Sequence, residues 1–510
     1  MRASTYLSTV IVMGATVAVA ACSAGAVTEA AGVGGSSSGT QSNGTGSLGT
    51  GAGTASTSTA GSTSSSTGTA STTSSSTTSS STSGAGAGGG ATDSKFPFPS
   101  VIYGGAELLL APKVITVTFP GDTLASELDQ FGASLTSSAY WKAVSTGYCE
   151  SASTCIGDGP TGTSVALTTA AGASYTDSSQ GGASTLQTYL QGLISSNKVP
   201  APDANTIYAL YFPASTTITL DGATSCQVFG GYHNSTTVNG QTVVYAVIPE
   251  CAPQGGGLSL LQETTISGSH EVVEGSTDPV NGQTTAGFYL DFSQQSSVGW
   301  NNMGGGEIGD LCVDFLGLGQ DETTENGFTV QRIWSVDNAA AGKNPCVPIP
   351  AGEVYFNAFP TVSAVVVDVG KSKTIEVDAL ADGAMSAWSV TPVDMTDQSG
   401  QTTYLSFTMP GSTSTMYGPE VQISSGGKIE LTVTMVKDPG QSQDQVGTGV
   451  LFSTKGSLAS ATAGHYWPFI VVTTAEAAKD GITMMKRNAA RSLRAFSYSK
   501  VGSPFFKAAR

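Results

Sequence analysis

The sequence predicts a mixed α+β, or α/β, head domain over residues 96–350 and an all-β sandwich domain over residues 351–474. In the head, strand-like apolar runs alternate with segments of helical period, the pattern of packed helices and sheets. After Pro350, short apolar or alternating runs are separated by turn residues and no helical period appears, which favours a sandwich. Residues 22–95 are almost entirely Gly, Ser, Thr and Ala, so they predict a disordered tether.

The N-terminus predicts export. Arg2 precedes an apolar run from Tyr6 to Ala21, which has the length of a signal-peptide core and is short for a membrane span. The run ends Ala20-Ala21-Cys22, which resembles a bacterial lipobox, so residues 1–21 are expected to be removed and Cys22 lipidated. An ordinary signal peptide with a chance cysteine is the alternative. Ser23 replaces the Asp that retains lipoproteins at an inner membrane, so we expect anchorage at the outer membrane or cell surface.

Composition excludes one class of partner. The net charge is −17, whereas a protein that binds nucleic acid needs a basic face. The one membrane signal in the sequence is the lipid expected on Cys22. Residues 475–510 hold eight basic residues and predict a solvated terminus, with a cationic helix on an anionic surface as the alternative. The sequence leaves the oligomeric state open.

Besides Cys22 the chain has six cysteines, an even number that predicts disulfides in an exported protein. Their order suggests three local pairs, but spacing alone leaves the connectivity open. The six are Cys149, Cys155, Cys226, Cys251, Cys312 and Cys346.

The head elements follow one another in a regular order. We expect strands at Glu107–Leu110, Lys113–Phe119, Thr206–Phe212 and Val243–Pro249, helices at 124–144 and 183–196, and a helix that contains His270. In the sandwich we expect seven strands, at Val362–Val369, Lys373–Ala379, Ala387–Val390, Thr403–Met409, Lys428–Val436, Gly449–Ser453 and Tyr466–Thr473.

The sequence around His270 carries the chemistry. His270 and Glu274 are four residues apart, so on a helix both project from one face and can share a metal ion. Glu271 is placed to act as general base toward a metal-bound water. The common zincin pattern has a second His where this chain has Glu274. The alternative is a structural helix in which His270 and Glu274 bond to each other.

Further ligands are needed from elsewhere in the chain. Glu307 and Asp310 supply carboxylates, and His233 is either an additional ligand or a group that stabilises an oxyanion. One imidazole with two carboxylates makes a harder site than two imidazoles, so Zn²⁺ is expected with Ca²⁺ or Mn²⁺ as competitors. His465, between apolar residues, is expected to be structural.

Several motifs in residues 110–347 carry a family resemblance. In chain order they are Ser138–Trp141, Cys226 with Gly231-Tyr232-His233, Val244–Val247, His270–Pro279, Glu307–Cys312 and Gln331–Ser335. This ordered set resembles the phosphate-induced protein 1 family, the Exordium-like proteins. The usual Cys-Gly-x-His of plant members is Gly230-Gly231-Tyr232-His233 here, which puts one cysteine pairing in doubt. The family is associated with extracellular growth responses and implies no established reaction.

The motif also resembles that of thermolysin-like zincins. That resemblance implies that Asp278 accepts a hydrogen bond from a ligand, and that Glu307-x-x-Asp310 is the downstream acidic ligand element. In the half of the chain that resembles the Exordium-like family, a Cys312–Cys346 bridge is expected to fix this element beside the helix.

Two functions follow as hypotheses. The first is a surface-tethered metal-dependent hydrolase, peptidase-like, that acts on an extracellular peptide. The second is a non-catalytic protein for adhesion or capture of a surface ligand. Metal content, together with the effect of changing Glu271, separates them.

Overall fold

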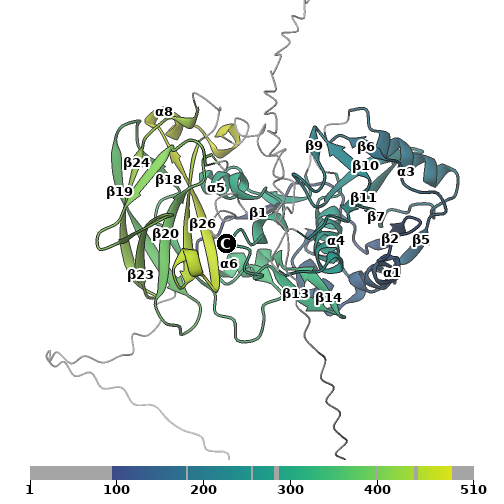
Figure 1. The fold of residues 1–510 in the computed structure, drawn as a ribbon, viewed down its shortest axis with the longest axis horizontal. Coiled ribbons are helices and arrows are strands. Elements are labelled where there is room, and N and C mark those ends of the chain that lie inside the picture. The colour runs from purple at the N-terminus through teal and green to yellow at the C-terminus, as the bar shows by residue number, and fades with distance from the viewer. Residues whose placement is uncertain are drawn as a thin grey trace, which may run out of the picture. The chain divides into compact units, whose positions relative to one another are not determined.

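The computed structural model describes residues 95–179, 182–253, 257–280, 286–397, 400–440 and 446–484 (Figure 1). The predicted signal peptide, the predicted lipidation site Cys22, the predicted tether up to Ser94 and the tail beyond Met484 lie outside the described residues. Within the described residues, no helix is both long enough and apolar enough to cross a membrane. They all belong to one compact unit, Gly88–Arg510.

The head is built on a five-stranded sheet of order β10-β11-β7-β2-β5. β2 (Lys113–Thr118), β5 (Thr163–Ala166), β7 (Thr206–Phe212) and β11 (Gln241–Pro249) are parallel, and β10 (Tyr232–Val238) is antiparallel to β11. Every residue of β7 is buried, as expected for a central strand of a parallel sheet covered on both faces. The predicted strands at 113–119, 206–212 and 243–249 are therefore confirmed.

Side chains of β7 alternate between two cores. Ile207, Ala209 and Tyr211 join the core that contains helices α1 (Ala125–Ser134) and α4 (Leu260–Thr277). Tyr208, Leu210 and Phe212 join the core that contains α3 (Thr185–Ser195). The period of two along a strand thus places α3 on one face and α1 with α4 on the other. The predicted helix at 183–196 is confirmed.

Two predicted head elements are wrong in detail. Residues 107–110 are not a strand, because Leu108 and Leu109 enter the core while their N–H groups bond to Glu150 Oε1 and the Ser276 carbonyl. The helix expected at 124–144 is interrupted. Its parts are α1, the 3₁₀ turn η1 (Leu135–Ser137) and α2 (Ala139–Ser145). The Ser138 hydroxyl accepts the Trp141 N–H at 3.0 Å, so α2 starts with its own N-cap.

Smaller elements complete the head. They are β1 (Val101–Tyr103) paired with β12 (Phe288–Leu290), β3 (Cys149–Ser151) with β4 (Thr154–Cys155), β6 (Ser174–Asp177) with β8 (Thr217–Leu220) and β9 (Ala223–Thr224), β13 (Glu322–Glu325) with β14 (Phe328–Gln331), β15 (Ile333–Trp334) with β16 (Cys346–Val347), and the helices α5 (Gln295–Met303), η2 (Asp310–Cys312) and α6 (Val336–Ala341).

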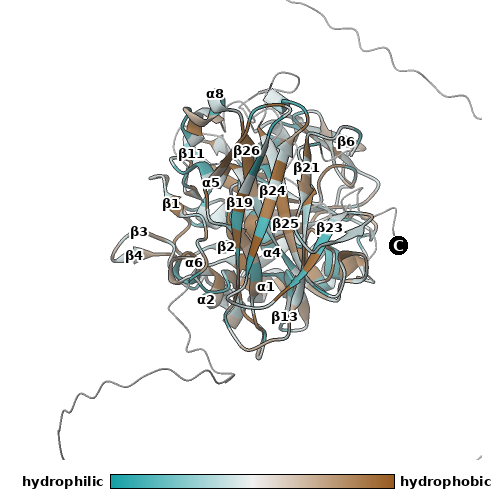
Figure 2. Cartoon of the chain, turned by 90° about the vertical axis from the view of Figure 1, so that its left-hand side faces the viewer, coloured by the Kyte–Doolittle hydropathy of each residue, from teal (hydrophilic) through white to brown (hydrophobic). Residues whose placement is uncertain are grey.

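The C-terminal part is a sandwich of two sheets, with orders β17-β19-β24-β21 and β18-β26-β25-β20-β23-β22. The strands are β17 (Phe356–Pro360), β18 (Ala364–Val366), β19 (Ser372–Ala381), β20 (Trp388–Asp394), β21 (Leu405–Thr408), β22 (Thr413–Thr415), β23 (Gly418–Ile423), β24 (Lys428–Met435), β25 (Gly447–Lys455) and β26 (Ala463–Val472). The 3₁₀ turn η3 (Leu458–Ser460) lies between β25 and β26, and α8 (Thr474–Ala477) follows β26. All seven predicted runs contain strands. Figure 2 shows the hydrophilic–hydrophobic alternation along β19 and β24.

Head and sandwich share one core. α5 packs against β26, and the Asn302 side-chain amide donates to Thr448 Oγ1 at 2.9 Å. Trp300 and Trp334 from the head contact each other, and Trp300 meets Trp467 of β26 with ring centroids 5.4 Å apart. The sandwich therefore supports α5, which lies just before the segment that contains Glu307.

The described cysteines form three local pairs: Cys149–Cys155, Cys226–Cys251 and Cys312–Cys346. The predicted bridge between Cys312 and Cys346 is confirmed, and it joins the end of η2 to β16. Departure from the plant motif at Gly230 does not disturb the pairing of Cys226, whose partner is Cys251.

Candidate metal centre

Helix α4 presents three ionisable side chains to one buried place. A capping box between Ser259 and Gln262 starts the helix, and all residues from Thr264 to Thr277 are buried. His270 and Glu274 lie one turn apart, with His270 Nε2 2.9 Å from Glu274 Oε2. Glu271 Oε1 is 4.0 Å from the same nitrogen. The predicted helical spacing is confirmed.

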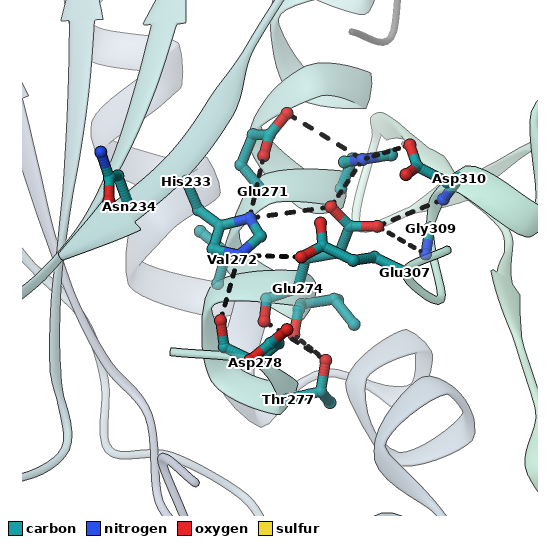
Figure 3. A network of polar contacts seen from close by, with 12 residues as sticks. His233, Asn234, Glu271, Val272, Glu274, Thr277, Asp278, Glu307, Gly309 and Asp310 are labelled. Atoms are coloured by element: carbon teal, nitrogen blue, oxygen red, sulfur yellow. Dashed lines mark hydrogen bonds and ion pairs between the residues drawn. The ribbon is translucent and has the colours of Figure 1, made fainter. Parts of the chain in front are cut away.

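Two other segments complete the cluster (Figure 3). From β10, His233 Nδ1 lies 3.5 Å from Glu271 Oε2 and 3.7 Å from Glu274 Oε2. From the segment before η2, Glu307 Oε1 lies 3.7 Å from His233 Nε2, and Asp310 Oδ1 lies 3.8 Å from His270 Nε2. These six side chains line a cavity of about 10 Å³, enough for one water-sized particle.

Backbone groups fix the orientation of Glu274. Its Oε1 accepts the N–H groups of Gly309 at 2.8 Å and Asp310 at 3.2 Å, so its Oε2 is directed at the two imidazoles. Burial raises the pKa of Glu274, but the facing His270, then His233 and the Gly309 N–H, lower it to about 2. Glu274 is therefore held as an anion with one oxygen directed at the centre.

Each imidazole is anchored through its far nitrogen. Gln331 Nε2 donates to the Gly309 carbonyl at 2.7 Å, so Gln331 Oε1 is an acceptor and takes the His270 Nδ1–H at 2.9 Å. His233 Nε2 lies 3.1 Å from the Asp278 carbonyl oxygen. His270 thus directs Nε2 at Glu274, and His233 directs Nδ1 at Glu271 and Glu274. This arrangement is typical of histidines that bind metal.

Histidine and carboxylate pKa values shift in the cluster. Burial alone lowers the pKa of His270, but Glu274 and Glu271 raise it well above its usual value. Burial raises the pKa of Glu307 and of Asp310 far above the ordinary range, and the anion of Glu274 adds to both shifts. For Asp310 the facing His270 and a backbone N–H offset part of this shift, whereas every main cause for Glu307 raises its pKa.

Some carboxylate oxygens of the cluster have no hydrogen-bond donor. Within the described residues, neither oxygen of Glu307 accepts a hydrogen bond, and Oδ2 of Asp310 accepts none either. Glu307 is only 1% exposed and Asp310 only 3%. Orphaned buried acceptors of this kind are rare in proteins and are normally satisfied by water or an ion. A divalent cation fits the oxygens present.

Glycine is required where the backbone approaches the cluster. A Cβ at Gly309 would lie 2.7 Å from two atoms of the His270 ring and 2.8 Å from Glu274 Oε1. Gly305 has φ +138°, and a Cβ there would lie 1.8 Å from Asp310 Oδ2. Side chains at these positions would displace His270, Glu274 and Asp310.

The structure brings together the predicted residues His233, His270, Glu271, Glu274, Glu307 and Asp310. Asp278 is adjacent but acts differently from the prediction. Its carbonyl faces His233, whereas its carboxylate accepts the Gly287 N–H at 2.7 Å and does not hold His270. Gln331 takes that role and was missed. In the sequence Gln331 is only a polar residue after the run 328–330, which gives no signal of this role.

His465 is structural, as expected. It is buried against Tyr355 and Phe356, with ring centroids 4.3 and 5.1 Å away. Burial lowers its pKa to about 3, and the nearby Arg332 and Lys455 act in the same direction.

No protein-family model and no curated protein matches the chain. Solved structures that it resembles in part include a conjugative transposon lipoprotein from Bacteroides eggerthii DSM 20697, with 11% identity over 23% of this chain and 95% of that one, TM-score 0.17. Domain 1 of VCBP3 from Branchiostoma floridae shows 10% identity over 24% of this chain and 98% of its own, TM-score 0.16. A conjugate transposon protein from Bacteroides vulgatus shows 12% identity over 24% and 89%, TM-score 0.16. Likeness at this level carries no functional conclusion.

Proposed function

We propose that the head binds a divalent metal at this cluster and is a metal-dependent hydrolase, peptidase-like, on an exported lipoprotein. The observation that carries the proposal is the number of buried carboxyl groups gathered around two imidazoles. Five carboxyl groups, those of Glu271, Glu274, Asp278, Glu307 and Asp310, are each at most 3% exposed, and two imidazoles face them. Buried charges of one sign are stable when they coordinate a cation.

The donor set favours Zn²⁺ or Mn²⁺ over Ca²⁺. Imidazole nitrogen with carboxylate oxygen suits these two ions, whereas Ca²⁺ takes oxygen ligands alone. His270 and Glu274 would hold the metal, with His233, Glu307 and Asp310 as the further donors. The bound metal would polarise a carbonyl and lower the pKa of water.

Glu271 is the general base in this proposal. Its carboxylate lies between the imidazoles, where it can take a proton from a water molecule, and burial is the main cause that raises its pKa. His233 has Nδ1 directed at the same place and would hold developing negative charge on the substrate.

The place of action is also proposed. Cys22 would anchor the chain at the outer membrane or cell surface, and the tether would extend the head toward extracellular peptides. The resemblance to Exordium-like proteins and zincins supports the proposed metal site, because the motifs that carry it include the His270 helix, Glu307 and Asp310.

Metal analysis and one variant test the proposal. The full chain, purified without chelator, is expected to carry Zn²⁺ or Mn²⁺, and a fluorogenic peptide library is expected to report metal-dependent cleavage. Glu271→Gln is expected to keep the metal and the thermal midpoint but lose cleavage. Loss of the metal in this variant would make Glu271 a ligand and contradict its assignment as base. Absence of metal after Zn²⁺ and Mn²⁺ loading would overturn the proposed function.

One observation favours a second candidate. All the site's side chains are buried and the cavity is small, which also suits a structural metal in a protein for adhesion or ligand capture. In that case the metal stabilises the head, and Glu271→Gln changes neither metal content nor ligand capture. Metal retention with no cleavage of any peptide pool by the wild type would support this candidate.

A further inference from the structure

Residues 307–312, the acidic segment, supply two of the six ionisable side chains of the centre and are held from two sides. Toward the head, the Gly309 N–H donates to Glu274 Oε1 of α4 at 2.8 Å. Toward the sandwich, the Tyr466 hydroxyl of β26 donates to the Leu311 carbonyl at 3.3 Å. The acidic segment therefore has one contact with the helix that carries His270 and another with the second domain.

The chain enters the acidic segment through helix α5 and three consecutive glycines, residues 304–306. Glycine restricts the backbone least, so this link does not by itself fix the segment that follows. Helix α5, in contrast, is fixed by the sandwich. The Asn302 side-chain amide donates to the fully buried Thr448 of β25 at 2.9 Å, and a Cβ at Gly299 would lie 3.3 Å from the Phe469 backbone of β26. The start of the acidic segment thus depends on contacts with the sandwich.

The loop that leaves the acidic segment also lies against β26. The Gly464 N–H donates to Gln320 Oε1. The Phe315 ring meets the Tyr466 ring edge-on, with centroids 5.0 Å apart, and Tyr466 also contacts Trp300 of α5 at 5.5 Å. One sandwich side chain, Tyr466, therefore contacts the helix before the acidic segment, the segment itself and the loop after it.

Contacts within the head fix only part of the acidic segment. The bridge Cys312–Cys346 joins its last residue to β16 of the head, but this bridge does not extend to α5 or to the glycine link. Within the described residues, neither oxygen of Glu307 accepts a hydrogen bond. The position of the Glu307 carboxyl group therefore follows from where its backbone is held.

We propose that the sandwich is a working part of the metal centre, in which Tyr466 and Thr448 are positioning residues that hold Glu307 and Asp310 against α4. This inference rests on the metal-binding function proposed above. Thr448 acts through helix α5, and Tyr466 acts through the carbonyl group next to Asp310. Because coupling between two sites is reciprocal, metal bound in the head stabilises the contact of β26 with the acidic segment.

Variants of the full chain that lack a single hydroxyl test the proposal. Tyr466→Phe keeps the ring and Thr448→Val keeps the shape of the side chain. Each is expected to bind Zn²⁺ about tenfold more weakly, the lower end of the roughly 10–100-fold effect of residues that orient metal ligands. Tyr208→Phe and Thr454→Val are the matched controls, because they remove hydroxyls that donate to backbone carbonyls outside the cluster, at 2.6 and 2.9 Å. Both controls are expected to bind Zn²⁺ as the wild type does.

Two further measurements separate positioning from a general loss of stability. Co²⁺ is a coloured substitute for Zn²⁺, and its visible spectrum reports the geometry of its ligands. This spectrum is expected to shift in Tyr466→Phe and Thr448→Val and to stay unchanged in the two controls. In the wild type, amide hydrogen exchange of β26 is expected to slow when Zn²⁺ binds.

The outcomes distinguish this proposal from the proposed function. Wild-type Zn²⁺ affinity and an unchanged Co²⁺ spectrum in Tyr466→Phe and Thr448→Val would overturn the positioning role and leave the metal-binding function standing. An affinity loss of equal size in the controls would also overturn the positioning role. A wild-type chain that binds no metal would overturn both proposals.

Discussion

Gln331 offers the sharpest test of how this centre is held. Its amide oxygen accepts the His270 Nδ1–H at 2.9 Å and its amide nitrogen donates to the Gly309 carbonyl at 2.7 Å. Gln331→Met keeps the size of the side chain but removes the acceptor of the His270 Nδ1–H; the Gly309 carbonyl still accepts the Cys312 N–H at 3.1 Å. Removing the partner of a buried polar group costs about 1–3 kcal/mol, so we expect a loss of about 1–3 kcal/mol in unfolding free energy.

The same substitution should weaken metal binding. Residues that orient a metal-ligating histidine typically contribute about 10–100-fold in affinity. Gln331→Glu is the informative control, because it keeps an acceptor for the His270 Nδ1–H while it replaces the donor to Gly309 and adds one buried carboxyl group. We therefore expect Gln331→Glu to bind metal more tightly than Gln331→Met. A second control, Gln191→Met, removes the hydrogen bonds of a half-buried glutamine on α3 and should leave metal affinity unchanged.

Urea unfolding of the metal-free chain gives the stability change, and competition with a chelator of known affinity gives the metal affinity. Equal losses of affinity in Gln331→Met and Gln331→Glu would show that the His270 contact is not what matters. An unchanged affinity in Gln331→Met would refute the role of Gln331 altogether.

Three further predictions concern other parts of the chain. Arg332→Met should destabilise by about 3–5 kcal/mol because it removes a buried guanidinium that bonds to the half-buried Glu353 and to the Cys346 and Gln320 carbonyls, whereas Lys428→Met at an exposed pair should have no measurable effect in the same urea assay. Burial, and then the neighbouring Asp122, raise the pKa of Glu250 to about 8, so protonated Glu250 stabilises the folded state. This stabilisation is complete below about pH 4.5, the pKa of Glu250 in the unfolded chain, and is lost as the pH rises to about 8. Glu250→Gln should therefore flatten the decline of the thermal midpoint between pH 5 and 8; an unchanged slope would contradict the shift. Cys22→Ser should move the protein from membrane to soluble fractions, and unaltered partitioning would argue against lipidation.

Local patterns predicted most of the secondary structure. The β7 and β24 sequences have the composition and period of their strands, so they were identified directly. The sequence did not reveal β22 and β23, because Thr413–Thr415 is polar and Gly418–Ile423 contains Gly and Pro. The break at Ser138 was missed because a capping serine inside an apolar period is indistinguishable from an exposed one.

The sequence predicted the ionisable residues of the site but not the residue that positions His270. His270, Glu271 and Glu274 follow from helical spacing alone, since four residues make about one turn. His233, Glu307 and Asp310 come from segments distant in sequence, and motif order rather than spacing suggested them. Gln331 could not be assigned a role, because only the folded chain shows that its amide lies between His270 and the Gly309 carbonyl. Hydrogen bonds between residues far apart in the chain could not be predicted from this single sequence.

Helix α4 is unusually polar for a fully buried helix, and this leads to the final prediction. Its Ser and Thr hydroxyls bond to carbonyls of the preceding turn, as Ser276 does to Val272 at 2.7 Å, but Glu274 must find its partners elsewhere. Near that anion, both oxygens of Glu307 and Oδ2 of Asp310 accept no hydrogen bond from the described residues, which a helix built only for packing would not need. The double substitution Glu307→Gln with Asp310→Asn should therefore stabilise the metal-free protein by about 0.5–2 kcal/mol and abolish the stabilisation that Zn²⁺ or Mn²⁺ gives the wild type. Thermal unfolding with and without metal measures both effects. If the double variant is less stable than wild type without metal, the carboxylates contribute to packing, and their assignment as ligands loses its support.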